Sequence, residues 1–103
     1  MVRSSVDIGK KIKAMRIAEG LTQSEMVQLV DISMGSLRDW EQGRGIPRSD
    51  YLTVITKHER FEKYAYWLMT DKTLPKSGQI APDFSILLEL GIVENDTDDK
   101  KTA

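Results

Sequence analysis

The chain has 103 residues, 40% hydrophobic and 30% charged, a balance that fits one globular domain and excludes wholesale disorder. Because it has no cysteine and a single histidine, it can form neither disulfides nor an ordinary zinc site, and its apolar runs are too short to cross a bilayer or to form a signal peptide. The net charge of −1 argues against a general polyanion binder, although residues 1–63 carry eleven Lys or Arg against nine Asp or Glu and residues 64–103 carry four against seven.

The first predicted helix begins at Ser4 or Ser5, either of which can act as its N-cap, and ends at Gly20, because glycine takes the left-handed conformation at a helix end without penalty. Three apolar side chains recur at helical spacing and should face the core: Ile8, Ile12 and Met15. Three lysines lie off this stripe: Lys10, Lys11 and Lys13. We interpret them as a solvated face, with phosphate contact as the alternative.

A capping box at residues 22–25, TQSE, predicts where the second helix begins, with Thr22 as the N-cap and Glu25 reaching back to it. This helix should extend to about Val30. Its core candidates are Met26, Val27 and Val30. The next two residues, Asp-Ile at 31–32, are predicted to form a tight corner.

The third predicted helix is short, from its N-cap Ser33 to about residue 42. Leu37 and Trp40 are three residues apart on its inward face, and Gly43 closes it. The inward face is therefore occupied, and five residues, all but one of them small or polar, remain for the other faces: Met34, Gly35, Ser36, Arg38 and Asp39.

Residues 44–47 read as a loop, and Ser49 is predicted to cap a fourth helix that continues through Thr56. A fifth helix is expected over residues 59–70, where apolar residues make a broad face: Phe61, Tyr64, Ala65, Trp67 and Leu68. Residues 1–71 would then form one domain of five helices.

Residues 72–103 read as a C-terminal arm. Two prolines and a glycine within residues 73–82 predict a loop or an extended segment. The apolar pattern of residues 83–93 fits a helix as well as a strand, and residues 94–103 read as a disordered polar tail.

Two short helices joined by a tight corner, the second of which begins with small residues, match the helix-turn-helix arrangement. The major groove of B-DNA admits one helix, and a preceding helix laid across the groove holds that helix at a fixed depth. Leu37 and Trp40 would anchor the third helix from behind. Its polar outer face could then enter a groove, so the pattern predicts a protein that binds double-stranded DNA.

The stretch GLTQSEMVQLVDISMGSLRDWEQGRGIP, residues 20–47, resembles the lambda-repressor-like (Cro/C1, or XRE) family, whose usual pattern is GLTQxxLAxxxGVSxxxISxWExGxxxP. The residues that match at the expected spacing are Gly20, Leu21, Thr22, Gln23, Ser33, Trp40, Glu41, Gly43 and Pro47. The resemblance covers about residues 8–58. It implies an all-α, lambda repressor-like fold with five helices, the third of which contacts DNA, and a short dimerisation segment that ends near residue 93.

The resemblance also implies DNA contact, to bases or to the backbone, for eight residues: Gln23, Ser33, Met34, Gly35, Ser36, Arg38, Asp39 and Arg44. Met34, Gly35 and Asp39 match the base-reading positions of the family, and Arg44 matches a loop that contacts phosphate. Gln23 matches a position that braces a phosphate and the first base-reading residue. Asp39 can accept a hydrogen bond from the cytosine N4 amino group but repels phosphate.

Arg16 and Glu41 match an internal ion pair that ties the first helix to the third, so we expect their role to be structural. The chain departs from the family pattern at Asp31, which replaces the usual glycine and tolerates the left-handed region better than most residues. Leu29 stands where the family is usually polar, which suggests packing against later residues. Because Gly35 has no side chain, direct base reading would be thin, and DNA shape would share the work.

A narrower resemblance concerns FEKYAYWLMTDKTLPKSGQIAP, residues 61–82, which is similar to the immunity repressors C of P-two-like temperate phages (Peduovirus group). It implies a small homodimeric repressor that maintains lysogeny by keeping the lytic promoter silent, in the cytoplasm of the bacterial host and at its nucleoid. Two copies spaced about 34 Å apart add their DNA contacts on one face of the duplex. The fifth helix and the segment after it offer more apolar surface than a five-helix core needs, so we predict that they form the dimer interface. The predicted dimer contacts are Phe61, Tyr64, Trp67, Leu68, Ile80, Phe84 and Leu87.

Two other interpretations stay open: an antitoxin-type protein-interaction module with autoregulatory DNA binding, and a Cro-type or restriction-controller regulator. An antirepressor protein is a further hypothetical partner. We do not expect an enzyme. The sequence has no nucleophile elbow to present a serine to the single histidine, and no glycine-rich phosphate loop is present. The sequence implies no cofactor, metal, small-molecule ligand or membrane partner.

Overall fold

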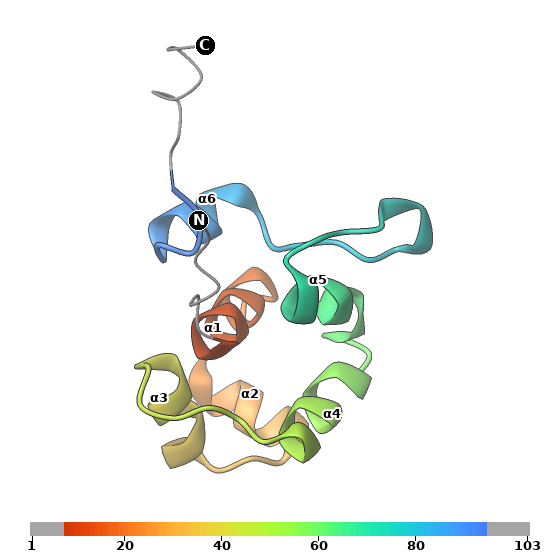
Figure 1. The fold of residues 1–103 in the computed structure, drawn as a ribbon. Coiled ribbons are helices and arrows are strands. Elements are labelled where there is room, and N and C mark those ends of the chain that lie inside the picture. The colour runs from red at the N-terminus through yellow and green to blue at the C-terminus, as the bar shows by residue number, and fades with distance from the viewer. Residues whose placement is uncertain (1–7, 95–103) are drawn as a thin grey trace.

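The structure is a computed structural model that describes residues 8–94. Over this range the chain forms, in order, α1 (Ile8–Ala18), α2 (Gln23–Val30), α3 (Met34–Glu41), α4 (Ser49–Lys57), η1 (Glu62–Tyr64), α5 (Ala65–Thr70), η2 (Pro75–Ser77) and α6 (Phe84–Glu89) (Figure 1). Within this range the β-structure is limited to an isolated bridge between Leu74 and Gln79. The predicted all-α class is therefore confirmed. The cap expected at Ser4 or Ser5 and the predicted polar tail fall outside the described residues, except for the first residue of the tail.

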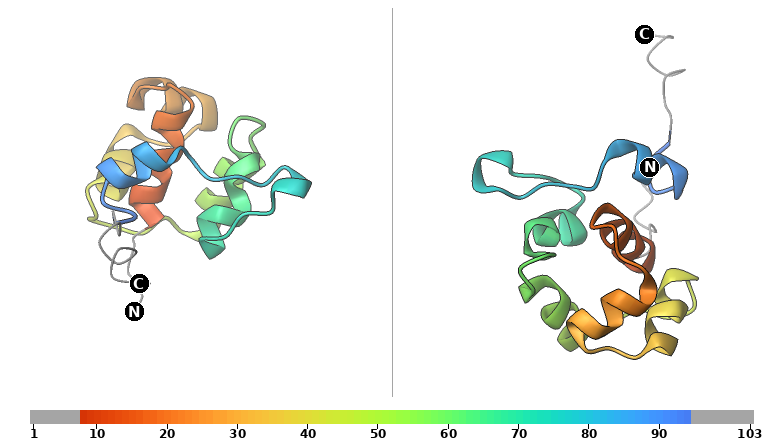
Figure 2. Two further views of the ribbon diagram at one scale, coloured as in Figure 1. Left: turned by 90° about the horizontal axis from the view of Figure 1, so that it is seen from above. Right: turned by 180° about the vertical axis from the view of Figure 1, so that it is seen from behind.

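Helix α1 runs through the middle of the molecule, where it contacts α3, α5 and α6 (Figure 1). Seen from behind, α4 and α5 lie to the left of α1, α2 and α3 lie below it, and α6 lies above it (Figure 2). Ile12 and Met15, two members of the predicted stripe, are fully buried, and Ile8 is partly buried. The core consists of Ile12, Ala14, Met15, Met26, Val30, Ile32, Leu37, Trp40, Ile55, Phe61, Tyr64, Trp67, Leu68 and Leu87.

Lys11, expected on a solvated face, is instead buried between α1 and α5. Its ammonium group donates to the backbone carbonyls of Trp67 at 3.1 Å and Leu68 at 3.0 Å, and it also pairs with Asp71. The last carbonyls of a helix lack partners within that helix, so a cation placed there is stabilising. The prediction failed because it considered only the charge of Lys11, whereas the aliphatic stem of a lysine can cross apolar surface.

Two boundaries predicted after the third helix are wrong. Arg48, not Ser49, is the N-cap of α4, and its side chain makes no capping hydrogen bond. The single helix expected over residues 59–70 is divided into η1 and α5. The chain turns before η1, where the backbone N–H of Phe61 donates to the carbonyl oxygen of His58 at 2.9 Å, and this turn places the Phe61 ring in the core.

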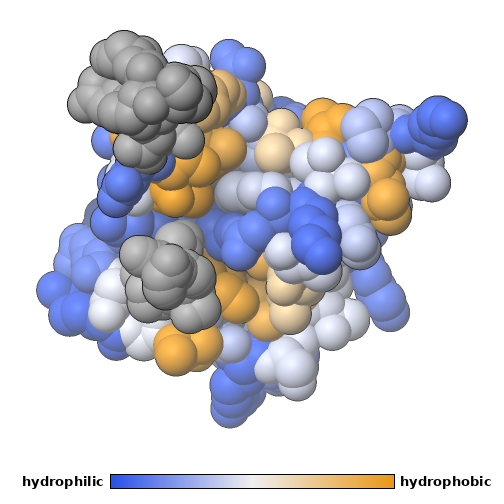
Figure 3. All heavy atoms as spheres, turned by 45° about the horizontal axis from the view of Figure 1, so that its top comes forward, coloured by the Kyte–Doolittle hydropathy of each residue, from blue (hydrophilic) through white to orange (hydrophobic). Residues whose placement is uncertain are grey.

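Five of the seven side chains predicted for a dimer interface are buried within one chain: Phe61, Tyr64, Trp67, Leu68 and Leu87. The expectation that they offer an apolar face to a second copy is wrong. The segment that the sequence left undecided between helix and strand forms α6, which packs against α1 and adds Leu87 to the core. Ile80 and Phe84 remain exposed, with 40% and 58% of their surface accessible. Figure 3, in which the top of Figure 1 is turned toward the viewer, shows apolar residues as separate patches with hydrophilic residues between them.

The first part of the predicted C-terminal arm, the segment between α5 and α6, is called the arm from here on. It is anchored at its base, and its tip projects from the body (Figure 2). Gln79 holds the base, because its Oε1 accepts from the backbone N–H of Tyr66 at 2.9 Å and its Nε2 donates to the carbonyl oxygen of Glu62 at 3.0 Å. The backbone N–H of Ile80 donates to the carbonyl oxygen of Lys63 at 2.9 Å. These bonds set the direction of the arm relative to α5.

Glu19 joins the end of α1 to the segment between α4 and α5. Its carboxylate accepts from Arg60 Nε at 2.9 Å and from the Tyr64 hydroxyl at 2.8 Å, and it lies 2.8 Å from Lys63 Nζ. Burial alone would raise the pKa of the Glu19 carboxyl, but the hydrogen bonds from Lys63, Arg60 and Tyr64 lower it from 4.5 to about 2. Burial and the bond to Glu19 raise the pKa of the Tyr64 phenol, which therefore stays protonated and donates.

We expect Glu19→Gln to destabilise the fold by about 2 kcal/mol at neutral pH and to have little effect near pH 2. The folded pKa of Glu19 lies below its ordinary value, so the charged carboxylate stabilises the fold above about pH 5, and this contribution disappears as the pH falls from about 5 to 2. Urea unfolding of both proteins at about pH 7, 4 and 2 measures the difference. A difference that stays constant over this range would contradict the assignment.

Candidate nucleic-acid interface

The corner between α2 and α3 is built from local signals. Thr22 Oγ1 accepts from the Glu25 backbone N–H at 3.0 Å, and Glu25 Oε1 accepts from the Thr22 backbone N–H at 2.9 Å, so the predicted capping box is present. Asp31 ends α2 in the left-handed region, with φ of 54°. Ser33 then caps α3 by accepting from the Ser36 backbone N–H at 3.1 Å. Each of these local predictions is confirmed.

The rear of α3 packs against α1 and α4. Leu37 is fully buried, and the Trp40 ring meets the Tyr51 ring of α4 edge-on, with centroids 5.3 Å apart. At Gly9 the backbones of α1 and α3 approach so closely that an added Cβ would lie 1.8 Å from the Trp40 carbonyl oxygen. Only glycine fits at this contact. Sequence reasoning missed Gly9, because a glycine within a helix carries no local sign of what lies opposite.

An ion pair ties α1 to α3 beside this contact. Arg16 Nε donates to Glu41 Oε2 at 2.8 Å and Nη2 donates to Oε1 at 2.9 Å, the two-pronged geometry of the strongest arginine–carboxylate pairs. Arg16 Nη1 also donates to the Leu21 carbonyl oxygen at 2.9 Å, and Gln23 Nε2 donates to Glu41 Oε1 at 3.0 Å. The ion pair expected between Arg16 and Glu41 is thus present. It also holds Gln23, at the start of α2, against the end of α3.

Opposite these anchors, α3 presents a continuous exposed stripe, which we call the α3 stripe: Gly35, Arg38, Asp39 and Gln42. Arg38 and Asp39 lie three and four residues after Gly35, and Gln42 lies four and three residues after them, so the four positions share one face of the helix. Met34 and Ser36 are half-buried beside the stripe, and Ser33 is exposed. An added Cβ at Gly35 would meet nothing within 4 Å, so the protein's own fold leaves this space empty. Gln42 was not among the predicted contacts, although its spacing from Asp39 and Gly35 places it on the same face.

A helix-turn-helix family model matches residues 12–58, which contain the whole α2–α3 pair. Repressor protein C of Escherichia phage P2 is 37% identical over 75 residues, which is 73% of this chain and 76% of that protein. The chain belongs to the Cro/C1-type helix-turn-helix family. Both resemblances found in the sequence are thereby confirmed. Membership makes the protein a DNA-binding regulator and not an enzyme, and the α3 stripe is its candidate DNA-contacting surface.

In this Cro/C1-type domain the loop after α3 carries two exposed arginines, each paired with a carboxylate. Arg44 Nη2 lies 3.3 Å from Asp39 Oδ1, and Arg48 Nη2 lies 3.1 Å from Asp50 Oδ2. The Arg48 guanidinium also lies 5.3 Å from the centre of the Tyr51 ring. Arg44 was predicted to contact phosphate, whereas Arg48 was not predicted to have a role. Arg44 therefore lies beside the α3 stripe, whereas Arg48 lies against the start of α4.

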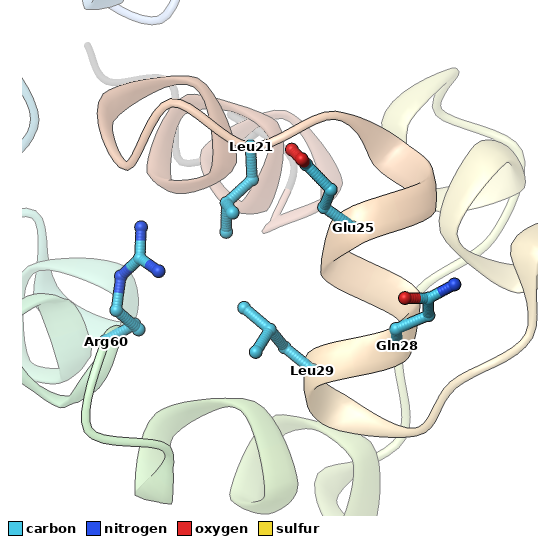
Figure 4. Close-up of a pocket in the computed structure, with 5 residues that line it drawn as sticks. All are labelled: Leu21, Glu25, Gln28, Leu29 and Arg60. Atoms are coloured by element: carbon cyan, nitrogen blue, oxygen red, sulfur yellow. The ribbon is translucent and has the colours of Figure 1, made fainter.

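A pocket lies between α2 and the segment after α4, lined by Leu21, Glu25, Gln28, Leu29 and Arg60 (Figure 4). Leu29, expected to pack against later residues, faces Arg60 across this open pocket and is 38% exposed. None of the predicted DNA contacts lines the pocket. Within residues 8–94 no cluster of His, Asp and Glu is placed to hold a metal ion, and no helix has the length and apolar content needed to span a membrane.

Proposed function

We propose that the protein is a sequence-specific repressor of a temperate phage that inserts α3 into the major groove of operator DNA. As a homodimer it would silence a lytic promoter and so maintain lysogeny, acting in the cytoplasm of the bacterial host at its nucleoid. The observation that carries this proposal is the α3 stripe, which is open to solvent while Leu37, Trp40 and Glu41 fix the helix from behind. The likeness to the phage P2 repressor supports the regulatory role.

Within this proposal the contacts divide by chemistry. Met34 offers an apolar surface to a thymine methyl group, Asp39 accepts from cytosine N4, and Gly35 lets the helix backbone approach the base edges. The cations Arg38 and Arg44 contact phosphates, which position the domain without reading sequence. The remaining contacts are polar groups near the helix starts, which suit phosphate oxygens: Gln23, Ser33 and Ser36.

Substitutions at Gly35 test the groove contact, because this position is empty in the free protein. Gly35→Ala should stabilise the fold by about 0.5 kcal/mol, since alanine favours a helix over glycine. Gly35→Glu should keep the fold but lower operator affinity at least about 30-fold, because it brings bulk and negative charge to the DNA. Thr53→Glu, on the exposed side of α4, controls for the added charge.

The measurement is fluorescence anisotropy with a duplex that the wild-type protein has selected from a random-sequence pool. Equal affinities of the wild type and Gly35→Glu for this duplex would contradict the proposal that α3 lies in the groove.

We propose that the dimer forms through the exposed part of the predicted interface, Ile80 on the arm and Phe84 at the start of α6. Leu74, which is 45% exposed on the same arm, extends this surface. Exposed apolar groups of this kind are what an interface buries.

The wild-type protein should sediment as a dimer at about 50 µM, and Phe84→Glu should shift it to monomer and weaken operator binding at least about tenfold. Val54→Glu, a matched change of a 45% exposed residue on α4, should do neither. Sedimentation of the wild type as monomer alone would refute the dimer.

The antitoxin interpretation needs an exposed apolar surface, on the fifth predicted helix and the segment after it, that a partner protein could cover. Most of that surface is in the core, so the structure leaves less of it for such a partner. Inactivation by an antirepressor stays a prediction.

A further inference from the structure

Asp39 and Arg44 form an ion pair at the edge of the surface proposed to meet DNA. The N···O distance is 3.3 Å, and the side chains are 53% and 63% exposed. The end of α3 fixes their proximity. Gly43 takes φ of 79° and its N–H donates to the Trp40 carbonyl at 3.0 Å, while the Arg44 N–H donates to the Asp39 carbonyl at 2.8 Å. This is the Schellman arrangement, which returns the chain beside the last turn of the helix.

We propose that Asp39 competes with DNA phosphate for Arg44 and thereby makes the phosphate contact of Arg44 conditional on the base that Asp39 meets. This inference rests on the proposed function, since it needs the α3 stripe to face the groove. It assigns Asp39 a second role in specificity besides accepting a hydrogen bond from a base.

The competition follows from charge. When Arg44 turns to a phosphate, the Asp39 carboxylate loses its counter-charge and faces the polyanion. At an operator, a cytosine N4 amino group can donate to Asp39 and replace the lost partner. Random DNA offers phosphates but no such donor at a fixed place, so the loss is not offset there. The pair therefore lowers affinity for random DNA more than affinity for the operator.

Arg38 provides a matched comparison on the same helix. It is exposed, it neighbours Asp39 in sequence, and it makes no ion pair within residues 8–94. A phosphate contact by Arg38 would thus be available on every sequence. Removing either arginine removes one positive charge, but only the removal of Arg44 abolishes the competition.

The experiment is a double-mutant cycle measured on two duplexes of about 30 base pairs. One has a scrambled sequence, and the other is the duplex selected by the wild type. Asp39→Asn should raise the affinity for scrambled DNA about fivefold. It should also lower the ratio of the affinity for the selected duplex to the affinity for scrambled DNA. In an Arg44→Ala background the gain should fall to about twofold, the part that comes from direct repulsion between Asp39 and phosphate, whereas in an Arg38→Ala background it should persist in full. Glu59→Gln, an exposed change of equal charge outside the interface, should give no comparable gain.

The outcomes distinguish a failure of the competition between Asp39 and phosphate from a failure of the proposed repressor function. Equal gains in the Arg44→Ala and Arg38→Ala backgrounds, or no gain at all, would overturn the competition and leave the repressor proposal standing. If the wild type selects no preferred sequence from the pool, the proposed function and this inference both fall.

Discussion

Gly9→Ala should destabilise the protein by about 3 kcal/mol and lower its Tm by more than about 10 °C. The new methyl group would lie 1.8 Å from the Trp40 carbonyl oxygen, which is a backbone atom and cannot move aside as the end of a flexible side chain could. Either α1 and α3 separate or the end of α3 shifts. The preference of alanine for a helix recovers less than about 1 kcal/mol of this cost.

Thermal unfolding followed by circular dichroism measures the effect, and Gly35→Ala is the matched control, since it adds the same methyl group to a helix at a site with nothing within 4 Å. We expect opposite signs for the two variants. A Gly9→Ala protein that melts with the wild type would show that α1 and α3 do not touch there.

Glu41→Ala has the second large expected effect, a loss of about 3 to 5 kcal/mol. Arg16, whose side chain is 12% exposed, would keep its charge without the carboxylate that satisfies two of its N–H groups. Gln23 would lose its acceptor at the same time. An uncompensated cation in a mostly buried site is costly because its desolvation is no longer offset.

Glu41→Gln keeps the shape and an acceptor oxygen, so it should lie between the wild type and Glu41→Ala in urea unfolding. The double variant Arg16→Met with Glu41→Leu should recover much of the loss, because it leaves no unpaired charge. If Glu41→Ala costs less than about 1 kcal/mol, the pair is a surface contact rather than a structural tie between α1 and α3.

The part of the fold that sequence reasoning predicted well is the part set by short-range chemistry. Thr22 with Glu25, Asp31 and Ser33 each act on neighbours within three residues, so their roles can be deduced from spacing alone. The α3 stripe follows from the same periodicity once Leu37 and Trp40 are assigned inward.

Features that depend on distant segments were missed or misplaced. Gly9 is required by the backbone of α3, and Lys11 is required by the end of α5, more than fifty residues along the chain. The dimer prediction failed for Trp67 and its neighbours for the same reason, because apolar side chains look alike in sequence whether their partner is α1 or a second copy. No local pattern in the sequence indicates that α6 packs against α1.

The central claim is that α3 enters the DNA groove, and backbone amide shifts on titration with the selected duplex test it most directly. The labelled protein should show its largest shift changes at residues 33–39 and at Arg44, with little change along α6 or around the pocket between Leu29 and Arg60. Changes concentrated at that pocket or on α6, with residues 33–39 unmoved, would contradict the account.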